Sequence, residues 1–285
     1  MTSSYALITG SSTGFGHSLA KSLASRGYNI MLVAVDDEHL KEAEELFKSK
    51  YGVDVLSFGI DLSKIEAAEK VANWFYDQNK KLSVLVNNVG IGEVSQFDET
   101  PLEVHMKMVN LNAVLMVKLT HLLLPALKKN NKAYILNVSS IASLFPVPYK
   151  TIYSATKSFV RTFSFALREE VKPKISITTT FPPAMFTNND IRRRVKSFGW
   201  IARAGTLEPD YVAEKSLIAL FKGKRQKFPG IVNNVYIRTR DFIGYRLTMR
   251  IIQNGIKKEI QNNKTSNIKL PVVPAKSPDY HLEEK

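Results

Sequence analysis

The sequence predicts an α/β protein whose core is a single doubly wound parallel sheet with helices on both faces. Short apolar runs alternate with longer amphipathic helical patterns from residue 5 to about residue 225. The short runs are almost continuously apolar, which is typical of parallel strands that are buried on both faces. A chain of 285 residues is also long enough to bury a large core without disulfides.

The expected elements follow from these runs. Strands are expected at residues 5–8, 29–34, 53–59, 82–86, 133–138, 176–181 and 230–235. Helices are expected to end near residues 25, 51 and 79 after the first three strands, and to cover residues 151–171 and 208–221. The segment 151–171 carries apolar residues at three- and four-residue spacings and stops before Pro173, which indicates a helix.

A glycine-rich turn joins the first strand to the first helix. It reads Gly10-Ser-Ser12-Thr13-Gly14-Phe15-Gly16. Glycines let the backbone approach a pyrophosphate closely, and the following helix directs its N-terminal N–H groups and the positive end of its dipole toward the same place. The position of the turn therefore favours phosphate binding over a plain turn, and indicates a Rossmann-type sheet.

Composition excludes several classes of chemistry. The chain has no cysteine, so disulfides, thiol nucleophiles and thiolate zinc sites are excluded. Its five histidines are scattered without ligand spacing, and no metal site is expected. No basic, apolar leader precedes Tyr5, so we expect a cytoplasmic protein, with peripheral attachment to a membrane as the alternative.

A tyrosine and a lysine stand four residues apart in the expected helix 151–171. If the helix forms, Tyr153 and Lys157 lie on one face and can contact the same small ligand. A free phenol has a pKa of about 10, and a neighbouring cation favours its ionised form. Such a pair also occurs by chance in many helices, so the evidence that it is catalytic comes from the motifs upstream.

Five motifs in order resemble those of the short-chain dehydrogenase/reductase superfamily. They are the glycine-rich turn, Asn87-Asn88-Val89-Gly90 after the fourth strand, Asn110, Ser140, and Tyr153 with Lys157. The resemblance covers residues 4 to 225, and the Phe-Pro-Gly at 228–230 with its basic surroundings resembles a subgroup that includes 3-ketoacyl reductases and hydroxysteroid dehydrogenase-like proteins.

This resemblance implies a mechanism. Tyr153 would be the general acid that protonates a carbonyl oxygen, or the base in the reverse direction. Lys157 would bind the nicotinamide ribose and lower the pKa of Tyr153, and Ser140 would hydrogen-bond the substrate oxygen. Asn110 would hold a water molecule that links Lys157 to solvent.

The resemblance also implies a cofactor, NADP or NAD. Its expected contacts are Gly10, Ser12, Thr13, Gly14, Phe15, Gly16, Asp36, Asp61, Leu62, Asn88, Gly90, Tyr153, Lys157 and Thr187. At the end of the second strand, Ala34 stands where an acidic residue would favour NAD, and Val35 stands where an arginine would favour NADP. Because no carboxylate at position 34 repels a phosphate, NADP is slightly favoured, while Asp36 can bind a ribose hydroxyl or simply begin a helix.

The C-terminal part is expected to differ from the catalytic domain at residues 1–225. Residues 184–206 occupy the place of a substrate lid, 226–262 form a basic amphipathic extension packed on the domain, and 263–285 are expected to be disordered. Residues 222–264 contain eleven Lys or Arg and two acidic residues. Interleaved apolar residues favour an anionic membrane surface as the partner, with contact between subunits as an alternative.

The remaining partner expectations are a homo-oligomer and no nucleic acid. Relatives in the superfamily commonly pair through the Tyr153 helix and the helix after Pro209, which implies a dimer or tetramer. No nucleic-acid recognition motif or aromatic stacking platform accompanies the positive charge.

The sequence therefore predicts an NAD(P)-dependent oxidoreductase that interconverts a ketone and a secondary alcohol on a lipophilic, acyl- or steroid-like substrate. The alternative is a non-catalytic NAD(P)-binding regulator or membrane-surface adaptor with the same fold.

Overall fold

All seven strands of the sheet run parallel. The computed structural model describes residues 4–186, 205–231, 234, 250 and 253–256. Across the sheet the strand order is β3-β2-β1-β4-β5-β6-β7. Their bounds are Ser4–Thr9, Asn29–Ala34, Val55–Gly59, Lys81–Asn87, Ala133–Val138, Ile175–Thr180 and Gln226–Lys227 for β1 to β7. The parallel sheet is confirmed, and six strands lie within a few residues of their expected positions.

The seventh strand does not lie where the sequence predicts it. Strand β7 consists of Gln226–Lys227 and pairs with Thr179 and Thr180 of β6. The expected strand at 230–235 begins instead with Gly230 at φ +89°, and the backbone N–H of Asn234 donates to the Gly230 carbonyl at 3.3 Å. A glycine in that conformation turns the chain out of the extended region, so the prediction for 230–235 is wrong.

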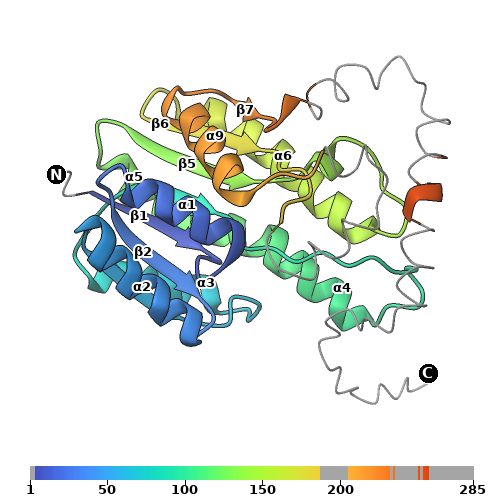
Figure 1. Ribbon diagram of the computed structural model, residues 1–285, viewed down its shortest axis with the longest axis horizontal. Coiled ribbons are helices and arrows are strands. Elements are labelled where there is room, and N and C mark those ends of the chain that lie inside the picture. Colours follow the sequence, from blue (N-terminus) through green and yellow to red (C-terminus); the bar gives the residue numbers. More distant parts are fainter. Residues whose placement is uncertain (1–3, 187–204, 232–233, 235–249, 251–252, 257–285) are drawn as a thin grey trace, which may run out of the picture.

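Helices cover both faces of the sheet (Figure 1). Their bounds are Gly14–Ala24 (α1), Glu38–Tyr51 (α2), Ala67–Asp77 (α3), Leu102–Val109 (α4), Leu115–Lys128 (α5), Thr151–Val171 (α6) and Pro209–Phe221 (α9), with a π-helical turn at Asn110–Val114 and a 3₁₀ turn at Ile141–Leu144. One buried apolar cluster joins α1, α2 and α9 to the sheet, and the other joins α3, α5 and α6. The structure thus has the predicted three layers.

One helical stretch in the described part of the chain is long and apolar enough to cross a membrane. It runs from Leu102 to Lys128, and half of its most apolar window is buried inside the protein. Leu115, Leu119 and Leu123 of this stretch belong to the cluster under α3 and the sheet. Packing in the core accounts for its apolar composition.

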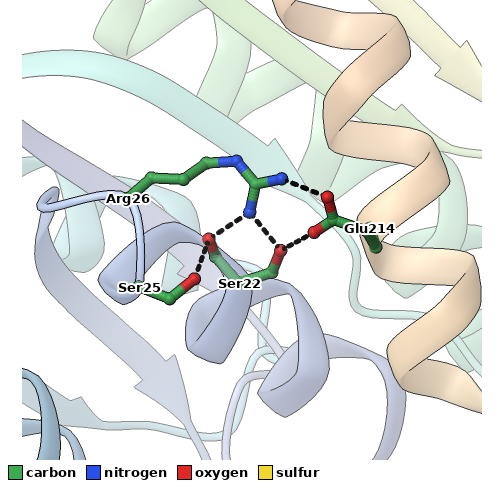
Figure 2. Close-up of polar contacts among 4 residues, drawn as sticks. All are labelled: Ser22, Ser25, Arg26 and Glu214. Carbon is green, nitrogen blue, oxygen red and sulfur yellow. Dashed lines mark hydrogen bonds and ion pairs between the residues drawn. The ribbon is translucent and has the colours of Figure 1, made fainter.

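Helix α9 is tied to α1 by a polar cluster (Figure 2). The Glu214 carboxylate of α9 accepts hydrogen bonds from Ser22 Oγ at 2.9 Å and from the Arg26 guanidinium at 2.6 Å. One turn earlier, Asp210 accepts from Ser18 at 2.6 Å and from Lys21 at 2.5 Å. Because α1 follows the glycine-rich turn, these contacts connect that turn with the segment that follows the expected lid.

Replacing Glu214 by alanine should lower the free energy of unfolding by about 0.5–1.5 kcal/mol, because the pair with Arg26 is partly exposed. The loss should shrink at high salt, which screens the pair. Urea unfolding at low and high salt checks this. Glu45→Ala serves as a control, since this exposed glutamate of α2 has no ion pair with a described residue; an equal loss in both variants would contradict the prediction.

Candidate active site

The glycine-rich turn forms a cradle at the carboxyl end of β1. Gly10 and Gly14 have φ values of +64° and +59°, which favour glycine. A Cβ on Gly16 would lie 1.9 Å from the Gly10 carbonyl oxygen, so the turn and the helix are in direct contact. Thr13 is the N-cap of α1, and its side chain makes no capping hydrogen bond. The first turn of α1 therefore keeps N–H groups for an anion, as a pyrophosphate requires.

Asn88 holds this cradle in place. Its Nδ2 donates to the carbonyl oxygens of Thr9 at 2.9 Å and Gly10 at 3.1 Å. Thr9 Oγ1 in turn accepts from the backbone N–H groups of Asn88 at 3.0 Å and Val89 at 3.2 Å. The amide of Asn88 is thus engaged with the turn, and its contribution to a ligand site is to position that turn.

His17, one of the five histidines without ligand spacing, also supports the turn. Its ring packs on Phe47 with centroids 4.9 Å apart. Burial lowers the pKa of His17, and a hydrogen bond to the Ser12 backbone partly offsets that effect. In the sequence, His17 directly follows Gly16, and this position could have indicated that it contacts the glycine-rich turn.

Tyr153 and Ser140 meet at the carboxyl end of β5. Ser140 is 8% exposed and is the N-cap of the 3₁₀ turn, where its Oγ accepts from the Ala142 N–H at 3.1 Å. The Ser140 hydroxyl also lies close enough to Tyr153 to lower the pKa of its phenol. The Tyr153 ring lies over Gly92, where a Cβ would come within 3.1 Å of Tyr153 Cδ2. The structure thus places the two hydroxyls at the same end of β5, and their role as donors stays a prediction.

The pKa of Tyr153 differs from the expectation. Burial of the phenol raises it above the ordinary value, and the hydrogen bond from Ser140 lowers it only in part. The Lys157 Nζ lies 6.0 Å from the centre of the Tyr153 ring. The neutral phenol is therefore favoured in this structure, because loss of water around the hydroxyl outweighs the hydrogen bond to its oxygen.

Lys157 is buried at the same end of β5. It is 4% exposed, and its Nζ donates to the Val138 carbonyl at 3.0 Å. Burial lowers the pKa of Lys157 to about 8. Ser139 Oγ donates to the Lys157 carbonyl at 2.8 Å, and a Cβ on Gly90 would lie 3.1 Å from Nζ. Glycine at position 90 therefore leaves the space that the ammonium occupies.

Asn112, which the sequence reasoning missed, lies beside Lys157. A Cβ on Gly90 would lie 2.9 Å from Asn112 Oδ1. This side chain is 2% exposed; its Oδ1 accepts from the Ile91 N–H at 2.9 Å, and its Nδ2 donates to the Ile91 carbonyl at 2.9 Å and to Thr156 Oγ1 at 3.1 Å. It joins the loop after β4 to α6. Two asparagines in an apolar helical run were the available signal.

Asn110 lies on a different side of the same turn. Asn110 is the first residue of the π-helical turn. Together with Leu62, Ile65 and Val114, it lines a small cavity of about 60 Å³. The described residues provide no hydrogen-bond partner for its amide. A π-helical turn places an extra residue in the helix, so Asn110 and Asn112 cannot be assigned to their surroundings by helical spacing alone.

The other expected cofactor contacts are divided among surface, core and undescribed residues. Asp36 is exposed and packs against Gly59. Asp61 is exposed and accepts from the Ser63 N–H at 2.9 Å and from Ser63 Oγ at 2.7 Å. Phe15 and Leu62 are 6% and 5% exposed and pack in the two apolar clusters, so their backbones rather than their side chains face any ligand.

Thr187 and most of the expected lid lie outside the described residues. The base of the lid is described: the Phe186 N–H donates to the Leu207 carbonyl and the Leu207 N–H donates to the Ala184 carbonyl, both at 3.1 Å. These two bonds hold the ends of the segment together beside the carboxyl end of β6. The expected tail at 263–285 lies outside the described residues, and so does most of the expected extension at 226–262. Among the described residues, no group of His, Asp and Glu could hold a metal ion.

Lys157→Met should stabilise the protein near pH 7 by about 1–3 kcal/mol. The folded pKa of about 8 lies below an unfolded pKa of about 10.4, so the buried charge is unfavourable below pH 8. As pH rises, Lys157 loses its proton in the folded protein before it does so in the unfolded chain. The free energy of unfolding of the original protein therefore increases between these two pKa values. The stability advantage of Lys157→Met over the original protein should then disappear.

Urea unfolding at about pH 7 and about pH 10 measures this difference. Lys70→Met, at an exposed position of α3, is the control and should show little pH-dependent change. A Lys157→Met variant that is no more stable than the original protein at pH 7 would contradict the burial argument.

Asn112→Ala should lower the free energy of unfolding by about 2–4 kcal/mol, because three buried hydrogen bonds are lost and their partners stay buried. Asn110→Ala should change it by less than about 1 kcal/mol. Chemical denaturation of both variants is the measurement. Equal destabilisation by the two substitutions would show that Asn112 is not the residue that holds the loop.

Comparison with known proteins gives the family. A family model for the short chain dehydrogenase matches residues 4–196. The very-long-chain 3-oxoacyl-CoA reductase of Rattus norvegicus is 36% identical over 178 residues, which is 60% of this chain and 55% of that protein. The chain thus aligns with about half the length of such relatives.

Solved structures agree. The L-sorbose reductase of Gluconobacter frateurii, complexed with NADPH and L-sorbose, is 26% identical with a TM-score of 0.71 and covers 80% of this chain and 95% of that one. An alcohol dehydrogenase of the archaeon Thermococcus sibiricus, complexed with 5-hydroxy-NADP, is 25% identical with a TM-score of 0.70 and covers 80% and 97%. With the ordered motifs gathered at one edge of the sheet, the chain belongs to the short-chain dehydrogenase family.

Proposed function

We propose that this protein is an NADPH-dependent oxidoreductase that reduces a ketone on a lipophilic acyl substrate, a 3-oxoacyl thioester, to the secondary alcohol. The observation that carries the proposal is the placement of Ser140 and Tyr153 together at the carboxyl end of β5, with the buried Nζ of Lys157 6.0 Å from the Tyr153 ring. The acyl substrate is supported by the similarity to proteins named very-long-chain 3-oxoacyl-CoA reductase.

The residues present fit a dinucleotide. The uncapped first turn of α1 and the contact of Gly16 with Gly10 suit a pyrophosphate. The choice of NADPH is supported by Ala34 and Val35 at the end of β2, which bring no carboxylate against a 2′-phosphate. It is also supported by the NADPH and NADP compounds in the similar structures. When bound, the cofactor supplies the hydride.

The roles of the chain's own residues follow from their surroundings. Tyr153 keeps its proton at neutral pH, because the ordinary pKa of a phenol is about 10 and burial raises it further, and it donates that proton to the carbonyl oxygen of the substrate. Ser140 donates a second hydrogen bond to that oxygen and holds it near Tyr153. Lys157, with a pKa of about 8, is mostly charged at pH 7 and favours negative charge on the phenol oxygen as the proton leaves.

A raised pKa of Tyr153 favours reduction over oxidation at neutral pH. Reduction needs the protonated phenol, which is present below its pKa. Oxidation needs the phenolate, so its rate should increase as pH rises toward that pKa.

We also propose a cytoplasmic homo-oligomer that attaches peripherally to an anionic membrane surface through residues 222–264. The support is the surplus of basic residues in that stretch. Exposed Phe159 of α6, at 46%, and Tyr211 of α9, at 43%, lie on the two helices through which a subunit contact is expected.

Purified protein with NADPH or NADH and a panel of 3-oxoacyl-CoA and ketosteroid substrates tests the activity. Tyr153→Phe should lower turnover by at least about a thousandfold, because the proton donor is lost, while NADPH binding, followed by its fluorescence, stays near the original value. Tyr76→Phe, at an exposed position of α3, is the control and should keep full activity.

Turnover that persists in Tyr153→Phe would show that another group is the acid. Tight NADPH binding without reduction of any carbonyl would instead support the non-catalytic binding protein.

A further inference from the structure

The loops at the amino-terminal edge of the sheet carry an unusual concentration of positive charge. All strands run parallel, so the loops that enter β4, β5 and β6 lie together at this edge, on the side of the chain's N-terminus (Figure 1). The loop that enters β7 begins there, with Gly223 beside Ser176, and then runs along β6 until the Arg225 carbonyl accepts from the Thr179 N–H at 3.0 Å. The four loops are residues 78–81, 128–132, 172–174 and 222–225, which contain no Asp or Glu. Their exposed cations, called here the cationic edge, are Lys80, Lys81, Lys128, Lys129, Lys132, Lys172, Lys174, Lys222, Lys224 and Arg225.

Few of these cations are neutralised within the described part of the chain. Lys80 lies 3.7 Å from Asp54, and Lys172 lies 2.7 Å from Glu169. The other eight have no ion pair with a described carboxylate. So many like charges on one edge repel each other in the free protein, and an anionic partner would relieve that repulsion.

A cavity of about 270 Å³ opens in the cationic edge between β4 and β5. Lys81, Lys129 and Lys132 line it together with Ser83 and Tyr134. Ser83 is 7% exposed, and its Oγ has no hydrogen-bond partner among the described residues. It stands where the register of β4 against β1 shifts, because Tyr5 pairs with Leu82 and Ala6 with Val84. The three lysines at the opening of one cavity suit an anionic headgroup.

We propose that the cationic edge docks on an anionic lipid membrane, with the cavity receiving the phosphate of a headgroup. This rests on the membrane attachment proposed above and changes its surface, because of the stretch 222–264 only residues 222–225 belong to the cationic edge. Nine of the ten cations are lysines, whose point charges suit a diffuse negative surface better than a fixed bidentate partner. Each basic residue near such a surface contributes about 1 kcal/mol. No exposed large apolar side chain lies in these four loops, so the contact is electrostatic and does not insert into the bilayer.

Nucleic acid fits this surface less well. The aromatic rings next to the cavity are already packed: Tyr28 stacks on Phe221 at 5.7 Å, and Tyr134 meets the same ring edge-on at 5.0 Å. They therefore offer no free faces on which bases could stack.

The docking has a consequence for substrate access. The basic stretch crosses from one edge of the sheet to the other: Gly223 lies beside Ser176 near the start of β6, whereas Phe228 stacks on Phe181 at the opposite end of β6, with centroids 4.6 Å apart. Ser140, Tyr153 and Lys157 lie at that opposite, carboxyl edge. A protein docked by its cationic edge holds these residues away from the bilayer, and its substrate reaches them from the aqueous side.

Co-sedimentation of the full chain with vesicles tests the surface. The protein should pellet with phosphatidylserine-containing vesicles at low salt and not with pure phosphatidylcholine vesicles. Lys129→Gln with Lys132→Gln should weaken binding about 10- to 30-fold, which corresponds to about 1 kcal/mol per lysine. The matched control is Lys41→Gln with Lys70→Gln, which removes the same charge from exposed positions of α2 and α3 and should change binding by less than about threefold.

Because the chain has no cysteine, single labels can report its orientation. A fluorophore on Asn131→Cys, at the cationic edge, should be quenched by a lipid-borne quencher, and one on Asp98→Cys, in the loop after β4, should not. Quenching only at position 98 would overturn the proposal, and so would an equal loss of binding in the two double-lysine variants. A protein that does not bind anionic vesicles would also overturn it, whether or not it binds an RNA oligonucleotide.

Reduction of a water-soluble ketone, measured on the same preparations, separates this proposal from the proposed activity. The Lys129 and Lys132 variant should keep the original rate, since neither residue lies near Tyr153. Retained activity without vesicle binding would reject the docking surface alone, whereas vesicle binding without activity on any carbonyl would reject the enzyme function alone.

Discussion

The common direction of the strands is the constraint on which the rest of the molecule depends. It brings the carboxyl ends of β1, β4 and β5 to one edge, where the glycine-rich turn, Asn88 and Ser140 meet. It also sends every loop that enters a strand to the opposite edge. The candidate active site and the cationic edge are therefore consequences of the same topology, and the length of the sheet separates them.

Burial of Lys157 lowers the stability of the folded protein and strengthens the effect of its charge on neighbouring groups. Its charged form is unfavourable where it lies, as the lowered pKa indicates, and one carbonyl, that of Val138, is its hydrogen-bond acceptor within the described structure. Two neighbouring residues allow this placement. Asn112 joins the adjoining loop to α6 by a hydrogen bond to Thr156, and Gly90, which has no side chain, leaves space for the Lys157 ammonium. Sites of this kind keep a destabilising charge because its field is stronger away from water.

The family similarity and the candidate site cover the same part of the chain. Residues 4–196 match the family model, and every described residue of the site lies within them. The segments expected to select the substrate, the lid and the basic C-terminal stretch, lie mostly beyond what the structure describes. Membership therefore supports a reaction class more directly than a substrate, since related folds accept different ligands through such segments.

Local sequence by itself determined the alternation of strands and helices, the helix Thr151–Val171 and the spacing that places Tyr153 and Lys157 on one face. These features depend on neighbours a few residues apart. Only the tertiary structure decided that Asn112 rather than Asn110 joins the buried hydrogen bonds, that the pKa of Tyr153 is raised, and that four separate basic loops form one edge. The loss of water around a side chain and the meeting of separate loops both depend on residues that are far apart in the chain. No local sequence pattern predicts which of these residues will be in contact.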